Sequence, residues 1–253
     1  KWEVLPLLKK YFPKEINTFY DLFGGGGTVA INATANKIVY NDINWVVRDL
    51  LEKITHDNFF STYNYIEKAI KRYGLEKKNK ETYIAFWDKY NSVEKASRNP
   101  LDLYLLICYG FEHQIRFNSK LEFNNPCGNS GYNQEMLEKL VSYSIRTKEL
   151  NIVFKSMDYK EFEEEIEKGD FIYCDPPYLN SCGAYNDGKR GFNGWDEFQE
   201  RELLDFLTRL DKKGVKFMLS NMTTRNSIEN KALKDWIDKN RYRVIKNQKI
   251  TLR

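Results

Sequence analysis

The sequence predicts an α/β protein built on a parallel β-sheet, with a largely helical insertion in the middle of the chain. Apolar runs of strand length alternate with amphipathic helical segments at both ends of the chain, as is typical of parallel sheets. Between residues 55 and 134 this alternation gives way to helical spacing and an irregular polar segment. With 253 residues, 42% of them hydrophobic, the chain can bury a sizeable core.

The first part of the chain reads as a strand, a glycine turn, a short helix and a second strand. Residues 18–23 (TFYDLF) are β-branched, aromatic and aliphatic, and Gly24 to Gly27 supply backbone freedom directly after them. Residues 37–40 form the second strand, which ends at Asn41 and Asp42. This order predicts a βαβ unit.

The middle of the chain is expected to be helical and then irregular. Apolar residues at three- and four-residue spacing predict helices over residues 45–54, 58–74 and 100–111. Residues 112–133 are rich in Asn, Ser and Gly and follow no regular period. A loop of this length within a compact domain usually has a function.

The second half of the chain returns to alternating elements. We expect helices over residues 134–150, 159–169, 196–214 and 229–240, of which the second is acidic. Strands are expected over residues 151–156, 170–175 and 215–221, with a last strand near 242–245. A polar loop is expected over residues 179–194.

Composition argues against several classes of protein. Forty basic and 36 acidic residues give a net charge of +4, which permits a polyanionic partner without requiring one. Four scattered cysteines and two isolated histidines predict neither a metal site nor a disulfide framework. We find no membrane span and no signal peptide, so a cytoplasmic protein is expected, and nothing points to an obligatory protein partner. Because the sequence opens on a lysine, we expect a longer natural chain.

The glycine turn and Asp42 together indicate a nucleoside-containing cofactor. Glycines after a strand let the backbone approach a ligand closely, and an acid about 20 residues further on can bind ribose hydroxyls. Val29 occupies the place of the third glycine of a dinucleotide-binding motif, which disfavours a pyrophosphate-bearing ligand and leaves S-adenosylmethionine. The alternative interpretation is a flexible turn followed by a helix-capping Asp.

The sequence Asp175-Pro176-Pro177-Tyr178 indicates a pocket for an amino group. It closes the apolar run FIYC, so Asp175 is expected at the carboxyl end of a central strand, where open α/β sheets bind ligands. The prolines fix the backbone, and the Asp175 carboxylate and Pro176 carbonyl then offer two acceptors side by side. Two acceptors and a stacking Tyr178 suit adenine N6, whose lone pair must be directed at an electrophile. The alternative is a Pro-Pro turn that simply ends a strand.

Taken together, the motifs resemble those of the Dam-type DNA adenine-N6 methyltransferases, the alpha group of the D12 class. That family has the order glycine motif, target-recognition insertion and D-P-P-Y. The resemblance covers nearly the whole chain, through LPLLKKYFP, DLFGGGGTVAIN, NDIN, RFNSKLEFNNPCG, DFIYCDPPY and KFMLSN. It implies a Rossmann-like S-adenosylmethionine-dependent sheet of the seven-stranded type. Residues 1–54 and 135–253 would be the catalytic, cofactor-binding domain and residues 55–134 the recognition insertion.

The resemblance also implies roles for individual residues. Catalysis is assigned to Asp175, Pro176, Pro177 and Tyr178. Cofactor binding is assigned to Lys1, which matches the lysine of an N-terminal G-x-K element, and to Phe23, Gly25, Gly27, Asp42, Asp158, Tyr159 and Asp175. For Asp158, an N-cap of the following helix is an equally good interpretation, and both roles can coexist.

The segment RFNSKLEFNNPCG is similar to the segment with which GATC-methylating members of the family read the DNA sequence. Gln114, Arg116, Asn118 and Pro126 are the candidate recognition residues, and Arg116 is the main candidate because its guanidinium matches the O6 and N7 edge of guanine. A phosphate contact or a solvated salt bridge is the alternative for Arg116.

The sequence therefore predicts an S-adenosylmethionine-dependent enzyme that methylates adenine N6 in double-stranded DNA, within GATC, by base flipping and direct transfer without a metal. Two alternatives stay open. One is a methyltransferase acting on RNA or on a protein amide, and the other is a catalytically idle DNA-binding relative.

Overall fold

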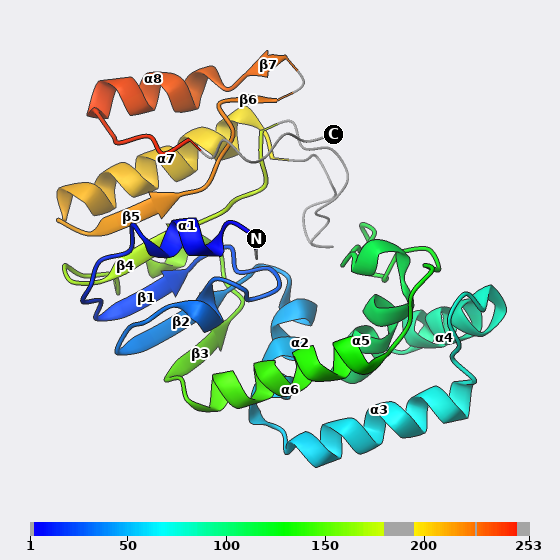
Figure 1. Ribbon diagram of the computed structural model, residues 1–253. Coiled ribbons are helices and arrows are strands. Elements are labelled where there is room, and N and C mark those ends of the chain that lie inside the picture. The colour runs from blue at the N-terminus through cyan, green and yellow to red at the C-terminus, as the bar shows by residue number, and fades with distance from the viewer. Residues whose placement is uncertain (1–2, 180–194, 226, 247–253) are drawn as a thin grey trace.

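The computed structural model describes residues 3–179, 195–225 and 227–246. Its centre is a sheet of five parallel strands in the order β3-β2-β1-β4-β5 (Figure 1). The strands are β1 (Thr18–Asp21), β2 (Lys37–Asn41), β3 (Ile152–Lys155), β4 (Phe171–Cys174) and β5 (Lys216–Leu219). The chain runs outward from β1 through β2 to β3 and then crosses back to β4, so the strand order reverses between β1 and β4.

Alternate residues of the strands face two separate hydrophobic clusters. Phe19 of β1 and Phe171 of β4 belong to the larger cluster, and their neighbours Tyr20 and Ile172 belong to the other. All four side chains are at most 4% exposed. Both faces of the sheet are therefore covered, which explains why the strands read as apolar runs rather than as alternating ones.

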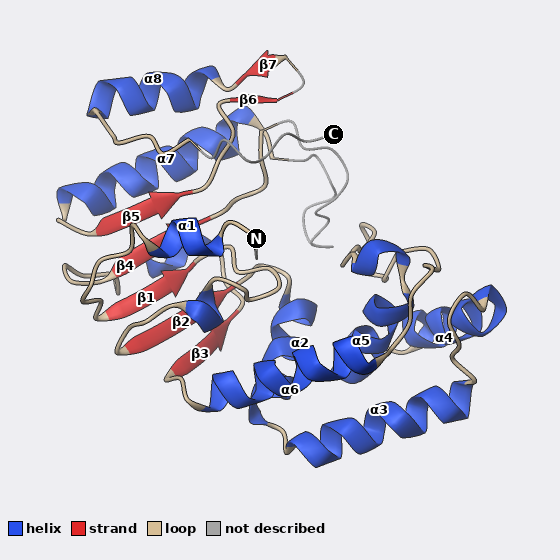
Figure 2. Cartoon of the chain, viewed as in Figure 1, coloured by secondary structure: helices blue, strands red, loops and turns tan. Residues whose placement is uncertain are grey.

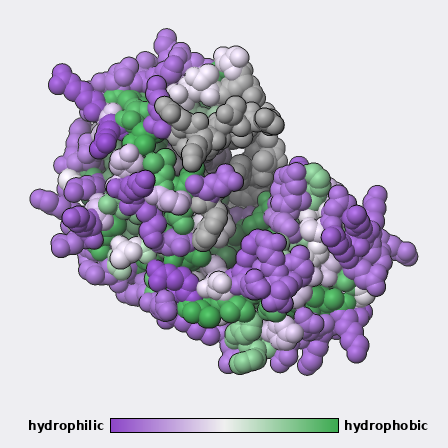
Figure 3. Space-filling model, in the orientation of Figure 1, coloured by the Kyte–Doolittle hydropathy of each residue, from purple (hydrophilic) through white to green (hydrophobic). Residues whose placement is uncertain are grey.

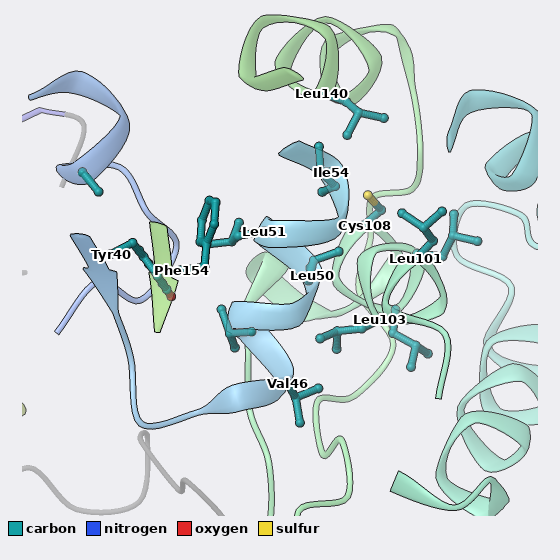
Figure 4. Close-up of a cluster of buried hydrophobic side chains, with 14 of the residues drawn as sticks. Tyr40, Val46, Leu50, Leu51, Ile54, Leu101, Leu103, Cys108, Leu140 and Phe154 are labelled. Atoms are coloured by element: carbon teal, nitrogen blue, oxygen red, sulfur yellow. The ribbon is translucent and has the colours of Figure 1, made fainter. Parts of the chain in front are cut away.

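The larger cluster continues from the sheet into helices α1 (Leu5–Lys9), α2 (Trp45–His56) and α6 (Gln134–Lys148). Figure 4 shows Leu50 and Ile54 of α2 between Tyr40 of the sheet and Leu101 of the insertion. The smaller cluster on the opposite face contains buried residues of α7 (Glu197–Lys212), against which α8 (Lys231–Asn240) packs. The result is a sheet between two layers of helices.

The insertion consists of α3 (Phe59–Tyr73), α4 (Lys80–Ser92) and α5 (Pro100–Tyr109), which lie together beside the sheet (Figure 2). Each begins at an asparagine, Asn58, Asn79 or Asn99, whose side chain accepts from a backbone N–H of the first turn. Helix α4 is a fourth helix of the middle region, in addition to the three predicted from the sequence. Among the described residues, the hydrophobic core continues across residue 55, the predicted start of the insertion, because α5 packs on α2.

Four expectations differ from the structure. The short helix after the glycine turn is a 3-10 turn, Ala30–Asn32. The acidic helix is a 3-10 turn limited to Tyr159–Phe162, consistent with repulsion among the glutamates that follow it. Residues 242–246 form no strand, and the described sheet has five strands rather than seven. Beyond β5, the two short strands β6 (Thr224–Arg225) and β7 (Ile228–Glu229) make a separate antiparallel pair.

The surface of the described residues is mostly polar. In the face shown in Figure 3, hydrophilic residues predominate and hydrophobic ones form scattered patches.

Within residues 3–179, 195–225 and 227–246, we find no helix that has both the length and the apolar character needed to cross a membrane.

Candidate active site

The candidate site lies where the strand order of the sheet reverses. The glycine turn follows β1 and the D-P-P-Y turn follows β4, and these two strands are hydrogen-bonded neighbours. Asp21 is in register with Tyr173, and the N–H of Leu22 donates to the Tyr173 carbonyl at 3.1 Å. In open α/β sheets, the carboxyl ends of the strands at such a reversal are the usual place for a ligand.

The glycine turn is held against β2 by specific contacts. The N–H of Gly24 donates to the Asn41 carbonyl at 2.8 Å, and the Tyr40 hydroxyl donates to the Gly25 carbonyl at 2.6 Å. A Cβ at Gly24 would lie 2.3 Å from the Tyr40 ring, so this position has room only for glycine. Gly25 and Gly27 have φ values of +49° and +74°, which glycine adopts without strain.

Asp42 joins the glycine turn to the start of α2. Its Oδ2 accepts from the N–H of Gly25 at 2.8 Å, and its Oδ1 accepts from the N–H of Asn44 at 2.8 Å. Asn44 in turn caps α2 by accepting from the N–H of Val46. The carboxylate is half-buried. The structure thus brings the predicted ribose-binding acid into direct contact with the predicted cofactor loop.

Asn41 is a site residue that was not predicted from the sequence. Its side chain is 1% exposed and donates to the carbonyls of Leu22 and Met157, both at 3.1 Å, while its Oδ1 accepts from the N–H of Met157 at 2.9 Å. It therefore ties together the segments that follow β1 and β3. An Asn at the end of an apolar strand was the available signal.

Three aromatic rings stand beside the glycine turn. The rings of Phe23 and Tyr159 lie 5.4 Å apart at 38°, and Phe23 meets Trp195 edge-to-face at 5.8 Å. Phe23 is half-buried, while Tyr159 and Trp195 are buried. Trp195 follows the polar loop after D-P-P-Y and was not predicted as a site residue. Apolar aromatic faces of this kind suit the adenine ring of a cofactor.

Asp158 caps the turn that begins at Tyr159. Its Oδ1 accepts from the N–H of Lys160 at 3.1 Å, and its own N–H donates to Glu161 at 2.9 Å, which forms a capping box. The capping interpretation is therefore confirmed. The cap also fixes Tyr159 against Phe23, so the same residue helps to shape the aromatic site.

The D-P-P-Y turn begins directly after β4. Pro176 is buried, whereas Asp175, Pro177 and Tyr178 are half-buried. The Tyr178 hydroxyl donates to Asp175 Oδ1 at 3.4 Å. The four predicted catalytic residues thus form one contiguous turn at the edge of the site.

The neighbours of Asp175 on β4 keep their protons. Burial, with a smaller contribution from the Asp175 charge, raises the pKa of Tyr173 well above its usual value, and its hydroxyl is 3.0 Å from that of Ser220. Burial likewise raises the pKa of the Cys174 thiol well above its ordinary value. Cys174 is therefore a neutral core residue and not a thiolate nucleophile.

A buried carboxylate supports the far side of the site. Glu200 of α7 is 0% exposed, and its Oε2 accepts from the indole N–H of Trp195 at 2.6 Å. Its Oε1 accepts from the side-chain amides of Asn221, after β5, and Asn230, at the start of α8, both at 2.8 Å. One carboxylate thus fixes three segments. The sequence pattern of α7 gave no sign of this role.

The recognition candidates lie on the insertion. Residues 115–125, hereafter the 115–125 hairpin, form two short limbs with an antiparallel bridge between Phe117 and Phe123. Arg116 lies on the first limb and is half-buried, and its carbonyl accepts from the N–H of Asn124 at 2.8 Å.

The other three candidates take mainly local contacts. Gln114 is exposed and donates to Glu112 at 3.0 Å, and Pro126 is exposed at the base of the hairpin. Asn118 closes the hairpin turn, because its Oδ1 accepts from the N–H groups of Lys120 and Glu122. Lys1, the remaining predicted cofactor residue, lies outside the described residues.

The fold is that of the Rossmann-like methyltransferases. Residues 1–251 match the family model of the D12 class N6 adenine-specific DNA methyltransferases. The chain belongs to this family.

Several curated proteins are similar to the chain. It is 42% identical over 242 residues to the type II methyltransferase M.FokI of Planomicrobium okeanokoites, and 38% identical over 239 residues to the modification methylase StsI of Streptococcus sanguinis. These matches cover 94% and 93% of this chain but 37% and 36% of the relatives, so the chain spans just over a third of their length. The DNA adenine methylase of Escherichia coli K12 is 23% identical over 246 residues, which are 97% of this chain and 84% of the relative.

Proposed function

We propose that this chain transfers a methyl group from S-adenosylmethionine to adenine N6 in double-stranded DNA. The observation that carries this proposal is the position of two motifs on neighbouring strands. The glycine turn with Asp42 and the D-P-P-Y turn both lie at the carboxyl edge of the sheet, on either side of the strand reversal. A cofactor held by the first motif and an amino group held by the second would meet there.

The glycine side of the site fits the proposed cofactor. A Cβ built on Gly25 or Gly26 would meet nothing within 4 Å, so a ligand can approach the backbone there. Phe23 and Tyr159 offer aromatic surface to an adenine, and Asp42 offers acceptors to ribose hydroxyls. Bound S-adenosylmethionine would supply the electrophilic methyl group.

The D-P-P-Y side would hold and orient the target amine. Asp175 and the Pro176 carbonyl accept its two hydrogens, and the rigid prolines hold these acceptors in place. This directs the nitrogen lone pair toward the methyl group, while Tyr178 stacks on the base. Catalysis then depends mainly on positioning and on fixed acceptors.

The target adenine would be flipped out of the duplex, because a stacked and paired base cannot present its amine to Asp175. For the sequence around it we propose GATC, with Arg116 reading a guanine in the major groove. Gln114, Asn118 and Pro126 would support that contact. We propose restriction-modification as the biological context, because the similar protein of Streptococcus sanguinis is named a modification methylase.

We further propose that residues 1–54 and 135–253 form the catalytic part and residues 55–134 the recognition part. Supporting this division, helices α3, α4 and α5 and the 115–125 hairpin lie together beside the sheet (Figure 1). Their contact with α2 would fix the recognition part relative to the site.

Tritium transfer from labelled S-adenosylmethionine tests the proposal. The acceptors are DNA duplexes with and without GATC, a matching RNA duplex and bulk protein. We expect label in GATC-containing DNA and none in RNA or protein. Label in RNA or protein would favour the first alternative, and no transfer to any acceptor despite cofactor binding would indicate an idle DNA-binding relative.

A further inference from the structure

The second limb of the 115–125 hairpin has two edges, and they are satisfied in different ways. One edge pairs with the first limb: the N–H of Asn118 donates to the Glu122 carbonyl at 2.9 Å, and the N–H of Asn124 donates to the Arg116 carbonyl at 2.8 Å. The carbonyls of residues 121, 123 and 125 and the N–H of Phe123 face the other way, whereas the N–H of Leu121 closes the hairpin turn by donating to the Asn118 carbonyl at 2.9 Å. In a larger sheet a third strand would pair there.

Side chains from α4 and the turn after it occupy the place of that strand. Asn91 donates from Nδ2 to the Phe123 carbonyl at 3.0 Å and accepts at Oδ1 from the Phe123 N–H at 2.9 Å. The amide group of asparagine has the same donor and acceptor as a peptide unit, so Asn91 pairs with Phe123 as a neighbouring strand would.

Arg98 and Tyr83 complete the row on either side of Asn91. Arg98 donates to the Leu121 carbonyl at 2.8 Å, and the Tyr83 hydroxyl donates to the Asn125 carbonyl at 2.7 Å. Both side chains are buried, at 9% and 2% exposure. Burial raises the pKa of Tyr83, which keeps its hydroxyl protonated as a donor.

Arg98 also binds the end of α4 to the same point. Its other nitrogens donate to the carbonyls of Val93 at 3.1 Å and Asn91 at 3.0 Å, and its guanidinium lies 4.9 Å from the centre of the Tyr90 ring. Its partner Leu121 has a φ of +58°, a conformation that a branched residue adopts only when its surroundings impose it. The tip of the hairpin is therefore held by Arg98.

We propose that Tyr83, Asn91 and Arg98 are positioning residues for DNA sequence readout. They fix the second limb, and the second limb fixes Arg116 through the Asn124–Arg116 hydrogen bond and the edge-to-face contact of Phe117 and Phe123 at 5.7 Å. A base contact depends on the position of the Arg116 guanidinium. A more mobile second limb would therefore reduce selectivity for the base and leave the methyl-transfer site unchanged. The inference rests on the proposed function of Arg116.

The test compares Asn91→Ala and Arg98→Lys with wild type on plasmid DNA, with methylated positions mapped by sequencing. Asn91→Asp is an isosteric third variant, which keeps the acceptor for the Phe123 N–H but places a second acceptor against the Phe123 carbonyl. Tyr65→Phe is the matched control: it removes a 2.7 Å hydrogen bond to buried Asp102 in the same insertion but away from the hairpin. S-adenosylmethionine binding is measured for every variant.

For the hairpin variants we expect unchanged S-adenosylmethionine binding. Their preference for the DNA sequence that the wild-type protein methylates, over sites with a single base changed, should be about fivefold to a hundredfold weaker. That is the range of one base contact. Tyr65→Phe should keep the wild-type preference. An unchanged preference in the hairpin variants would overturn the inference, as would a parallel loss of cofactor binding and of methylation at all sequences. If wild type itself methylates no DNA, the proposed function fails instead.

Discussion

The carboxylate of Asp42 accepts a hydrogen bond from the backbone N–H of Gly25 at 2.8 Å. The two residues follow neighbouring strands, β2 and β1, and this bond fixes the glycine turn to the acid that is proposed to bind the cofactor ribose. The proposed cofactor loop is therefore shaped by the side chain that is proposed to bind the ribose.

Replacing Asp42 with Ala should weaken S-adenosylmethionine binding in two ways, because the ribose loses an acceptor and the Gly25 turn loses its anchor. Charge-assisted hydrogen bonds contribute about 1.5–3 kcal/mol, so we expect a dissociation constant about tenfold to a hundredfold higher. Isothermal titration measures it. Asp205→Ala, at an exposed carboxylate on α7, is the control and should bind as wild type does.

Gly24 and Gly26 form a matched pair for a stability test. A Cβ at Gly24 would lie 2.3 Å from the Tyr40 ring, whereas a Cβ at Gly26 would meet nothing within 4 Å. We expect Gly24→Ala to lower the free energy of unfolding by about 1–3 kcal/mol and Gly26→Ala to change it by less than about 1 kcal/mol. Urea unfolding compares them, and equal values would show that Tyr40 does not restrict this turn.

Glu200 should be more important for stability than its position on a helix suggests. In Glu200→Gln an amide replaces the carboxylate, and its NH₂ must face either the Trp195 indole or the two Asn amides, all of which are donors. We expect a loss of about 2–3 kcal/mol and a changed Trp195 fluorescence spectrum. Glu202→Gln breaks only a half-exposed pair with Lys160 and should cost less than about 1 kcal/mol. Similar losses in both variants would contradict this account.

The pair of Glu163 and Arg209 makes a small, pH-dependent contribution. Arg209 donates to both Glu163 oxygens, at 2.6 and 2.8 Å, and this bond lowers the pKa of Glu163. The pKa of Glu163 is lower in the folded state than in the unfolded state. The pair therefore stabilises the fold at pH values above the unfolded-state pKa, and its contribution disappears as the pH falls through the folded-state pKa.

We therefore expect Arg209→Gln to lower the free energy of unfolding by less than about 1 kcal/mol at neutral pH, given the exposure of the pair. Its difference from wild type should vanish in acid. Urea unfolding of both proteins across the acidic range measures this, and a difference that grows on acidification would contradict the assignment.

The sequence was sufficient for the parts of the fold that depend on short-range patterns. Four of the five described strands fall within predicted segments, and β2 extends one residue beyond its segment. Asp42 and Asp175 directly follow strands, and Gly25 lies in the turn after β1, as expected. The family, too, was correctly identified from the order of its motifs. Strand ends in a parallel sheet share one edge, so linear order alone predicts their proximity.

Long-range polar contacts could not be predicted in the same way. Glu200 reads as one of many surface acids on α7 and becomes a buried anchor only through Trp195, Asn221 and Asn230. Likewise, Asn91 lies outside the three helices predicted for the middle region, and only the fold places it beside Phe123. The final predicted strand fails for a related reason, since Tyr242 packs on Trp236, with ring centres 4.5 Å apart, instead of extending the sheet.

The central claim is that the protein methylates adenine N6 in DNA and that the D-P-P-Y turn holds the target amine. Mass spectrometry of nucleosides from DNA incubated with the protein and S-adenosylmethionine tests it most directly, with Asp175→Ala as the matched variant. We predict N6-methyl-2′-deoxyadenosine as the modified nucleoside with wild type, and at least about a hundredfold less of it with the variant. The variant should keep its stability because Asp175 is half-exposed. A methylated cytosine as the product, or full activity in Asp175→Ala, would contradict the claim.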